Sequence, residues 1–98
     1  MDGLADLRAF PLLLVDDEED NLTIFRLNFK NLFTIHTASS GEEALKILAE
    51  REIAILIVDQ RMPNMTGVEL LNIASERWPQ TIRVLMTAYA DIDVVIEA

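Results

Sequence analysis

Acidic side chains carry the strongest chemical signal in this sequence. Five acids occupy positions 16–20, directly after an aliphatic run, and Asp59 ends a second aliphatic run. A run of acids is by itself typical of a solvated turn at a helix start, and a single acid after a strand can simply mark the return of the chain to water. The joint arrangement is more informative, because three carboxylates in one crevice repel one another unless a cation lies among them.

A hard divalent cation suits such a cluster. Carboxylates, a backbone carbonyl and waters form the oxygen set of Mg²⁺, which keeps several waters that phosphate oxygens can replace. Mg²⁺ beside a carboxylate nucleophile favours transfer of a phosphoryl group to that carboxylate. Thr87 ends a third aliphatic run and could donate its hydroxyl to a phosphoryl oxygen, although threonine there is also a common turn former. The small Ala88 beside it would keep the pocket open.

Two other kinds of site have no support. The chain has no cysteine, and its one histidine, His36, falls within a predicted strand, so a zinc site is not expected and His36 is interpreted as a structural or surface residue. A Gly-rich phosphate loop of the GxxxxGK type is also absent from the sequence, which leaves nucleotide hydrolysis without support.

Composition narrows the class of protein further. With 98 residues, the chain is long enough for one domain, and its 51% apolar content predicts a folded core. Charged residues interrupt every apolar run, so a membrane span is not expected. A net charge of −9 leaves no basic surface for direct nucleic-acid binding. The lack of cysteine and of a signal sequence favours a cytoplasmic location.

Strands and helices are predicted to alternate along the chain. Short β-branched or aliphatic runs indicate strands, and apolar residues at three- and four-residue steps indicate helices. The predicted strands cover residues 12–15, 33–38, 54–58 and 82–86, and the predicted helices cover 20–32, the residues after Ser40, 68–78 and the opening of a fourth helix at 91–98. This alternation predicts an α/β fold with a parallel sheet, in which ligands bind at the carboxyl ends of the strands.

Helix ends and inward faces follow from the same patterns. Ser40 with Glu43 fits a capping box, and Thr66 is a candidate N-cap for the third helix. The residues expected to face the core are Leu22, Phe25, Phe29 and Leu32 in the first helix, Ala44, Leu45, Leu48 and Ala49 in the second, and Val68, Leu71 and Ala74 in the third.

Four stretches of the chain carry a family resemblance. LLVDDE at 13–18, SGEEAL at 40–45, IVDQRMPNMTG at 57–67 and VLMTA at 84–88 resemble the receiver domain of two-component response regulators. The resemblance implies a flavodoxin-like, doubly wound parallel sheet, and the strand order 2-1-3-4 is taken from that family. It places the receiver domain at residues 11–98 and leaves residues 1–10 as an N-terminal appendage.

The resemblance also implies roles for individual residues. Asp59 would accept a phosphoryl group from a sensor histidine kinase. Asp17 would bind Mg²⁺ directly and Asp16 mostly through water, and the metal site would also include Asp59 and the backbone carbonyl of Arg61. Thr87 would be the switch residue that controls an output domain outside this chain, expected to be a transcriptional regulator. The chain would then be a signalling domain rather than an enzyme.

Three further residues lie where the family has secondary roles. Arg61 and Tyr89 occupy positions that tune the access of water to the phosphorylated site, and Glu18 is a candidate helper at the metal. The segment from Asp59 to Pro63 resembles the corresponding segment in receivers of enhancer-binding transcription activators or of cyclic-dinucleotide phosphodiesterases.

One departure from the family is expected to matter. The family has a lysine at the end of a fifth strand, whereas the eleven residues after Thr87 contain no lysine and leave no room for another βα unit. We therefore expect a C-terminally incomplete domain in which the strand at 82–86 is an exposed edge, with a homodimer formed through that strand or the fourth helix. Because the missing lysine would offset charge on the phosphoryl group, phosphorylation by small donors should be slower by roughly 10²-fold or more.

Two other functions stay open from the residues. A truncated or degenerate receiver could act as a docking and dimerisation module that is not phosphorylated. A magnesium-dependent phosphatase of the haloacid dehalogenase type also uses an aspartate after a strand, but it would need Asp-x-Asp, and Asp59 is followed by Gln60 and Arg61.

Overall fold

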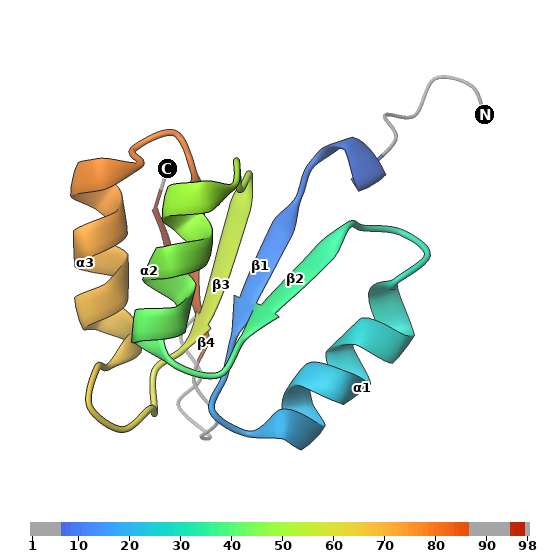
Figure 1. Ribbon diagram of the computed structural model, residues 1–98, viewed down its shortest axis with the longest axis horizontal. Coiled ribbons are helices and arrows are strands. Elements are labelled where there is room, and N and C mark those ends of the chain that lie inside the picture. The colour runs from blue at the N-terminus through green and yellow to red at the C-terminus, as the bar shows by residue number, and fades with distance from the viewer. Residues whose placement is uncertain (1–6, 87–94, 98) are drawn as a thin grey trace.

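A five-stranded sheet with the order β2-β1-β3-β4-β5 forms the centre of the protein (Figure 1). The computed structural model describes residues 7–86 and 95–97. The strands are β1 Leu12–Val15, β2 Ile35–Ala38, β3 Ile55–Asp59, β4 Ile82–Met86 and β5 Val95–Glu97. The helices are α1 Glu19–Phe29, α2 Gly41–Glu50 and α3 Gly67–Arg77, preceded by a short 3-10 turn, η1 Leu7–Ala9.

The four strands predicted from the sequence are confirmed as one parallel sheet. β1 pairs with β2 on one side and with β3 on the other, and β3 pairs with β4, all in parallel. The expected α/β class and the order 2-1-3-4 are therefore correct. No helix within the described residues is both long and apolar enough to span a membrane.

The end of the chain differs from the prediction. Val95–Glu97 forms β5, which pairs antiparallel with β4, so a helix over these residues and an exposed β4 edge were both wrong. The connection from Met86 to Val95 covers only residues 87–94, whereas a parallel pair needs a crossover of about a dozen residues or more. An antiparallel return is the pairing that so short a connection allows.

The two faces of the sheet have separate apolar cores. Figure 1 shows α2 and α3 next to each other on one side of the sheet, with α1 lying apart from them. The larger core lies under α2 and α3, and its fully buried side chains include Leu13, Val15, Leu56, Val58 and Leu70. The smaller core joins Leu12, Leu14 and Leu22, and partly buried apolar side chains pack against it.

The inward face of α1 is shorter than its sequence pattern suggests. Leu22 is buried and Phe25 is partly buried, but Phe29 and Leu32 are exposed, so their predicted core positions were wrong. The helix ends at Phe29, which takes Leu32 off the helical face. The Phe29 ring instead contacts those of Phe25 and Phe33, with centroids 4.7 and 6.4 Å away.

Single positions on α2 and α3 also depart from the prediction. Ala49 is exposed because it follows Leu48 and therefore lies about 100° further around the helix. Val68 is exposed because Gly67 and Leu70 take the buried positions of the first turn of α3.

Side chains cap the N-termini of α2 and α3. Ser40 Oγ accepts a hydrogen bond from the Glu43 amide at 3.1 Å, as predicted, but the Glu43 carboxylate accepts from the Ser39 amide at 2.7 Å instead of from Ser40. The predicted capping box is therefore only half correct. At α3, Thr66 and Glu69 form a complete box, with distances of 3.2 and 2.8 Å.

The larger core should dominate stability. Leu56→Ala removes a side chain that is 0% exposed, and we expect it to lower the free energy of unfolding by about 2–5 kcal/mol. Leu27→Ala is the matched control, since Leu27 is 62% exposed and its loss should change stability by no more than about 0.5 kcal/mol. Urea unfolding followed by circular dichroism measures both, and equal losses would contradict this packing.

Candidate metal-binding site

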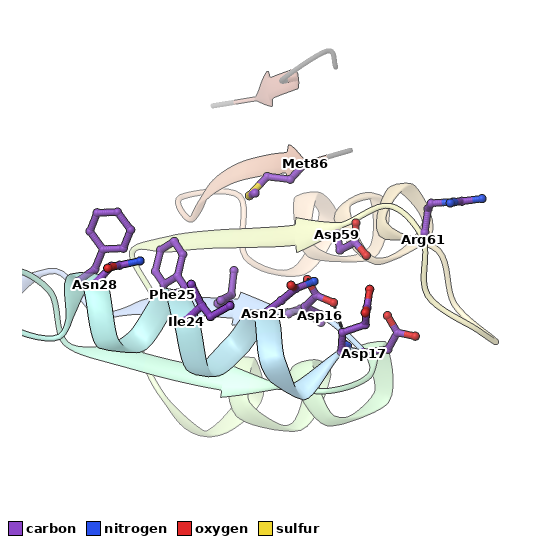
Figure 2. A pocket seen from close by; sticks show the side chains of 13 residues that line it. Asp16, Asp17, Asn21, Ile24, Phe25, Asn28, Asp59, Arg61 and Met86 are labelled. Carbon is purple, nitrogen blue, oxygen red and sulfur yellow. Dashed lines mark hydrogen bonds between the residues drawn. The ribbon is translucent and has the colours of Figure 1, made fainter. Parts of the chain in front are cut away.

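The register of β1 and β3 brings the predicted acids together. Val15 and Val58 are register partners, so Asp16 and Asp59 follow side by side at the carboxyl ends of adjacent strands. Asp17 is the next residue along the chain. One carboxylate oxygen from each of the three acids lies within 4.8 Å of the others (Figure 2). The structure therefore places the three carboxylates in one cluster, as the sequence predicts.

Exposure differs among the three acids. Asp16 is only 9% exposed, Asp59 is partly buried, and Asp17 is exposed. The cluster lies at one end of a cavity of about 570 Å³ between α1 and the sheet. The rest of that cavity is largely apolar, with Leu14, Ile24, Phe25, Phe29 and Met86 in its lining. A cation could therefore reach the cluster from the Asp17 side and keep part of its water.

Asp16 is held in place through both of its oxygens. Asp16 Oδ1 accepts a hydrogen bond from the Glu18 amide at 2.9 Å, and Oδ2 accepts one from Asn21 Nδ2 at 3.0 Å. Asn21 is not among the site residues predicted from the sequence. The sequence feature that could have identified Asn21 is that it is the first neutral polar residue after five consecutive acids, in the first turn of α1.

Asp59 lies in an unfavourable electrostatic environment. Burial raises the pKa of its carboxyl above the ordinary value, and the negative charge of Asp16, with smaller contributions from Asp17 and Glu18, raises it further. A hydrogen bond from the backbone amide of Arg61 to the carboxylate acts in the opposite direction. Ionised Asp59 is therefore less favourable in the folded chain than in water, and a cation bound beside it would offset this.

The loop after β3 fixes the end of that strand. The Gln60 amide donates to the Met86 carbonyl at 2.9 Å, and the Gln60 carbonyl accepts from the Gly67 amide at 3.2 Å. A Cβ on Gly67 would come within 2.8 Å of the Asp59 carbonyl oxygen, so the absence of a side chain allows this close approach. Gln60 Oε1 also accepts from the Val68 amide at 3.0 Å and so ties β3 to the start of α3.

The other predicted site residues are not all placed. Arg61 is exposed, and Figure 2 shows its side chain extending away from the three carboxylates. Thr87 and Ala88 lie outside the described residues, as does Tyr89. His36 is partly buried in β2, where burial and the nearby Arg51 and Arg26 lower its pKa. Within the described part of the chain, the metal-competent cluster contains no histidine.

Comparison with known proteins gives the family that the chain matches. A family model for the response regulator receiver domain matches residues 12–98. The hydrogenase transcriptional regulatory protein HoxA of Cupriavidus necator is 36% identical over 85 residues, which is 87% of this chain and 18% of HoxA. The chain thus spans less than a fifth of that curated relative.

Solved structures that resemble this chain are also receiver domains or response regulators. The signal receiver domain of an HD domain-containing protein from Pseudomonas fluorescens superposes with a TM-score of 0.80 at 32% identity, covering 84% of this chain and 66% of that one. The response regulator protein TrrA from Thermotoga maritima, solved in complex with Mg²⁺ and BeF, has a TM-score of 0.77 at 29% identity, covering 83% and 71% of the two chains.

The raised pKa of Asp59 predicts a pH-dependent gain from neutralising it. In metal-free protein, Asp59→Asn should raise the free energy of unfolding at pH 7, because ionised Asp59 is less favourable in the folded chain than in the unfolded one. The gain should shrink as the pH falls and vanish below the ordinary value of 3.8, where both states are protonated.

Urea unfolding in EDTA across this pH range measures the effect. Asp20→Asn is the control, since Asp20 is an exposed acid in the first turn of α1 and favours the helix dipole, so its neutralisation should bring no gain. An Asp59→Asn variant that is less stable than the wild type at pH 7 would contradict the electrostatic account of the cluster.

Proposed function

The chain belongs to the response regulator receiver domain family, and from this premise we propose that Asp59 accepts a phosphoryl group from a sensor histidine kinase. The observation that supports this most strongly is the position of Asp59 beside Asp16 and Asp17 at the carboxyl edge of the sheet. Ligands of open α/β sheets bind at this edge. The matched region also includes all three acids.

Mg²⁺ is the cofactor that this donor set fits. In our proposal, Asp17 and Asp59 bind the ion directly, the backbone carbonyl of Arg61 adds a ligand, and Asp16 acts through water. Three acidic oxygens within 4.8 Å of one another are suited to a hard cation, and the raised pKa of Asp59 indicates that positive charge is needed there. TrrA, solved with Mg²⁺ and BeF, supports the same choice.

The proposed reaction is a single displacement at phosphorus. A carboxylate oxygen of Asp59 forms a bond to phosphorus, while the bond between phosphorus and the kinase histidine nitrogen breaks and the imidazole leaves with the electron pair. The bound cation would offset charge on the phosphoryl oxygens. Hydrolysis of the acyl phosphate restores Asp59, so the chain changes only its own covalent state, which describes a signalling domain rather than an enzyme with a separate substrate.

Thr87 is proposed to report phosphorylation. Met86 is the register partner of Asp59, and Thr87 is the next residue in sequence, beside the small Ala88. If the threonine hydroxyl turns toward the phosphoryl group, it would shift a nearby surface between two conformations, and the output domain would bind these two conformations differently.

The output is proposed to be a transcriptional regulator in a longer cytoplasmic protein. HoxA is named as a transcriptional regulatory protein, and the chain matches 18% of its length. The P. fluorescens neighbour belongs to an HD domain-containing protein, so a second type of output is also represented among similar structures. Self-association along this side of the sheet stays a prediction, and it would use the outer edge of β5 because β4 is already paired.

Phosphorylation of Asp59 is directly testable. On prolonged incubation with acetyl phosphate and Mg²⁺, the wild-type chain should gain the mass of one phosphoryl group, measured by intact-protein mass spectrometry. Asp59→Asn should gain none, because its amide is not a nucleophile toward phosphorus. Asp20→Asn should label like the wild type, and EDTA should prevent labelling.

Two results would decide against this function. Equal labelling of the wild type and Asp59→Asn would place the phosphoryl group elsewhere. A wild-type chain that binds Mg²⁺ but takes no label from acetyl phosphate or from a histidine kinase would favour a docking module that works without phosphorylation.

A further inference from the structure

A neutral side chain lies among the acids of the cluster. Asn21 Nδ2 donates to Asp16 Oδ2 at 3.0 Å, and the Glu18 amide donates to Asp16 Oδ1 at 2.9 Å. Figure 2 shows Asn21 on α1 next to Asp16, on the cavity side of the sheet. Both oxygens of Asp16 therefore accept hydrogen bonds, one from the N-cap residue of α1 and one from its first turn.

We propose that Asn21 is a positioning residue that sets the Mg²⁺ affinity of this chain by holding Asp16 in place. The inference rests on the proposed function, because it concerns the same metal site. Asn21 itself would not touch the ion. Its amide would fix the plane of the Asp16 carboxylate, so that the waters between Asp16 and Mg²⁺ meet an oxygen whose direction is already set.

The electrostatics of the cluster explain why Asp16 needs such a partner. Carboxylate oxygens of Asp16 and Asp59 lie within 4.8 Å of each other, so repulsion between the two negative charges pushes the Asp16 side chain away from Asp59. At 9% exposure, the Asp16 side chain is largely enclosed by protein, so protein donors have to supply part of its hydrogen bonding. The Glu18 amide, just before α1, and the Asn21 side chain, in its first turn, hold the Asp16 carboxylate against this repulsion before any ion arrives. Metal binding then does not have to order that carboxylate.

The chemistry of the first turn favours asparagine at this position. Glu19 and Asp20 are acids without a donor when ionised, whereas the Asn21 amide offers hydrogens without adding negative charge. Asn28 gives a matched comparison. It lies two turns later on the same helix and lines the same cavity, but its side chain donates no hydrogen bond to any of the three acids.

A magnesium titration followed by amide NMR spectra tests the proposal. MgCl₂ is added to metal-free wild type, Asn21→Ala and Asn28→Ala, and the shifts of the Asp17 and Asp59 amides report the affinity. Loss of a residue that orients a metal ligand typically costs about 10- to 100-fold in affinity, so Asn21→Ala should bind Mg²⁺ about tenfold more weakly. Asn28→Ala should match the wild type, and the spectrum of each variant shows whether it is folded.

A second background separates positioning from a general effect on the fold. If Asn21 acts through Asp16, Asn21→Ala should cause no further loss of affinity in an Asp16→Ala chain. A further tenfold loss in that background would overturn the proposal, as would equal affinities of wild type and Asn21→Ala. Absence of any magnesium-dependent shift in the wild type would overturn the proposed function together with this inference, whereas equal affinities would leave the proposed function standing.

Discussion

The mutual repulsion of three carboxylates at one edge of the sheet is the constraint on which the rest of this structure depends. The backbones of Asp16 and Asp59 cannot separate without shifting the register of β1 against β3, because each acid follows one of the register partners Val15 and Val58. Both valines are fully buried in the larger core, and a one-residue slip would turn the apolar side chains of a strand to the opposite face. The packing of the core thus holds the acids together against their charge.

The surrounding groups reduce this repulsion without removing it. Donors from Glu18 and Asn21 engage Asp16, and the Arg61 amide engages Asp59, but the pKa of Asp59 is still raised. Gly67 lets α3 begin directly against the end of β3, so the backbone around Asp59 is supported from the opposite face of the sheet. A rigid edge with unbalanced negative charge is suited to a divalent cation and, with that cation, to a phosphoryl group.

Much of this arrangement could be predicted from local patterns. Short β-branched runs that end in acids identify buried parallel strands, and the rule that such strands share a carboxyl edge brings Asp16 and Asp59 together before any coordinates are known. Features set by tertiary competition could not be predicted. The β4–β5 pairing depends on which strand edge a short connection can reach. Loop geometry decides that the Glu43 carboxylate accepts a hydrogen bond from the Ser39 amide and not from the Ser40 amide. The hydrogen bond from Asn21 to Asp16 joins a helix turn to a strand end, and no spacing rule in the sequence predicts such a contact.

The position of a bound divalent ion would show whether the three carboxylates form a metal site. Crystals grown with Mn²⁺, which accepts the same oxygen ligands as Mg²⁺, would locate the metal by its anomalous scattering. We expect one strong anomalous peak at metal–oxygen bonding distance from the carboxylates of Asp17 and Asp59 and from the backbone carbonyl of Arg61. The hydrogen bond between Asn21 and Asp16 should still be present. A peak away from these acids, or a structure in which the three carboxylates have moved apart and hold no metal, would contradict it.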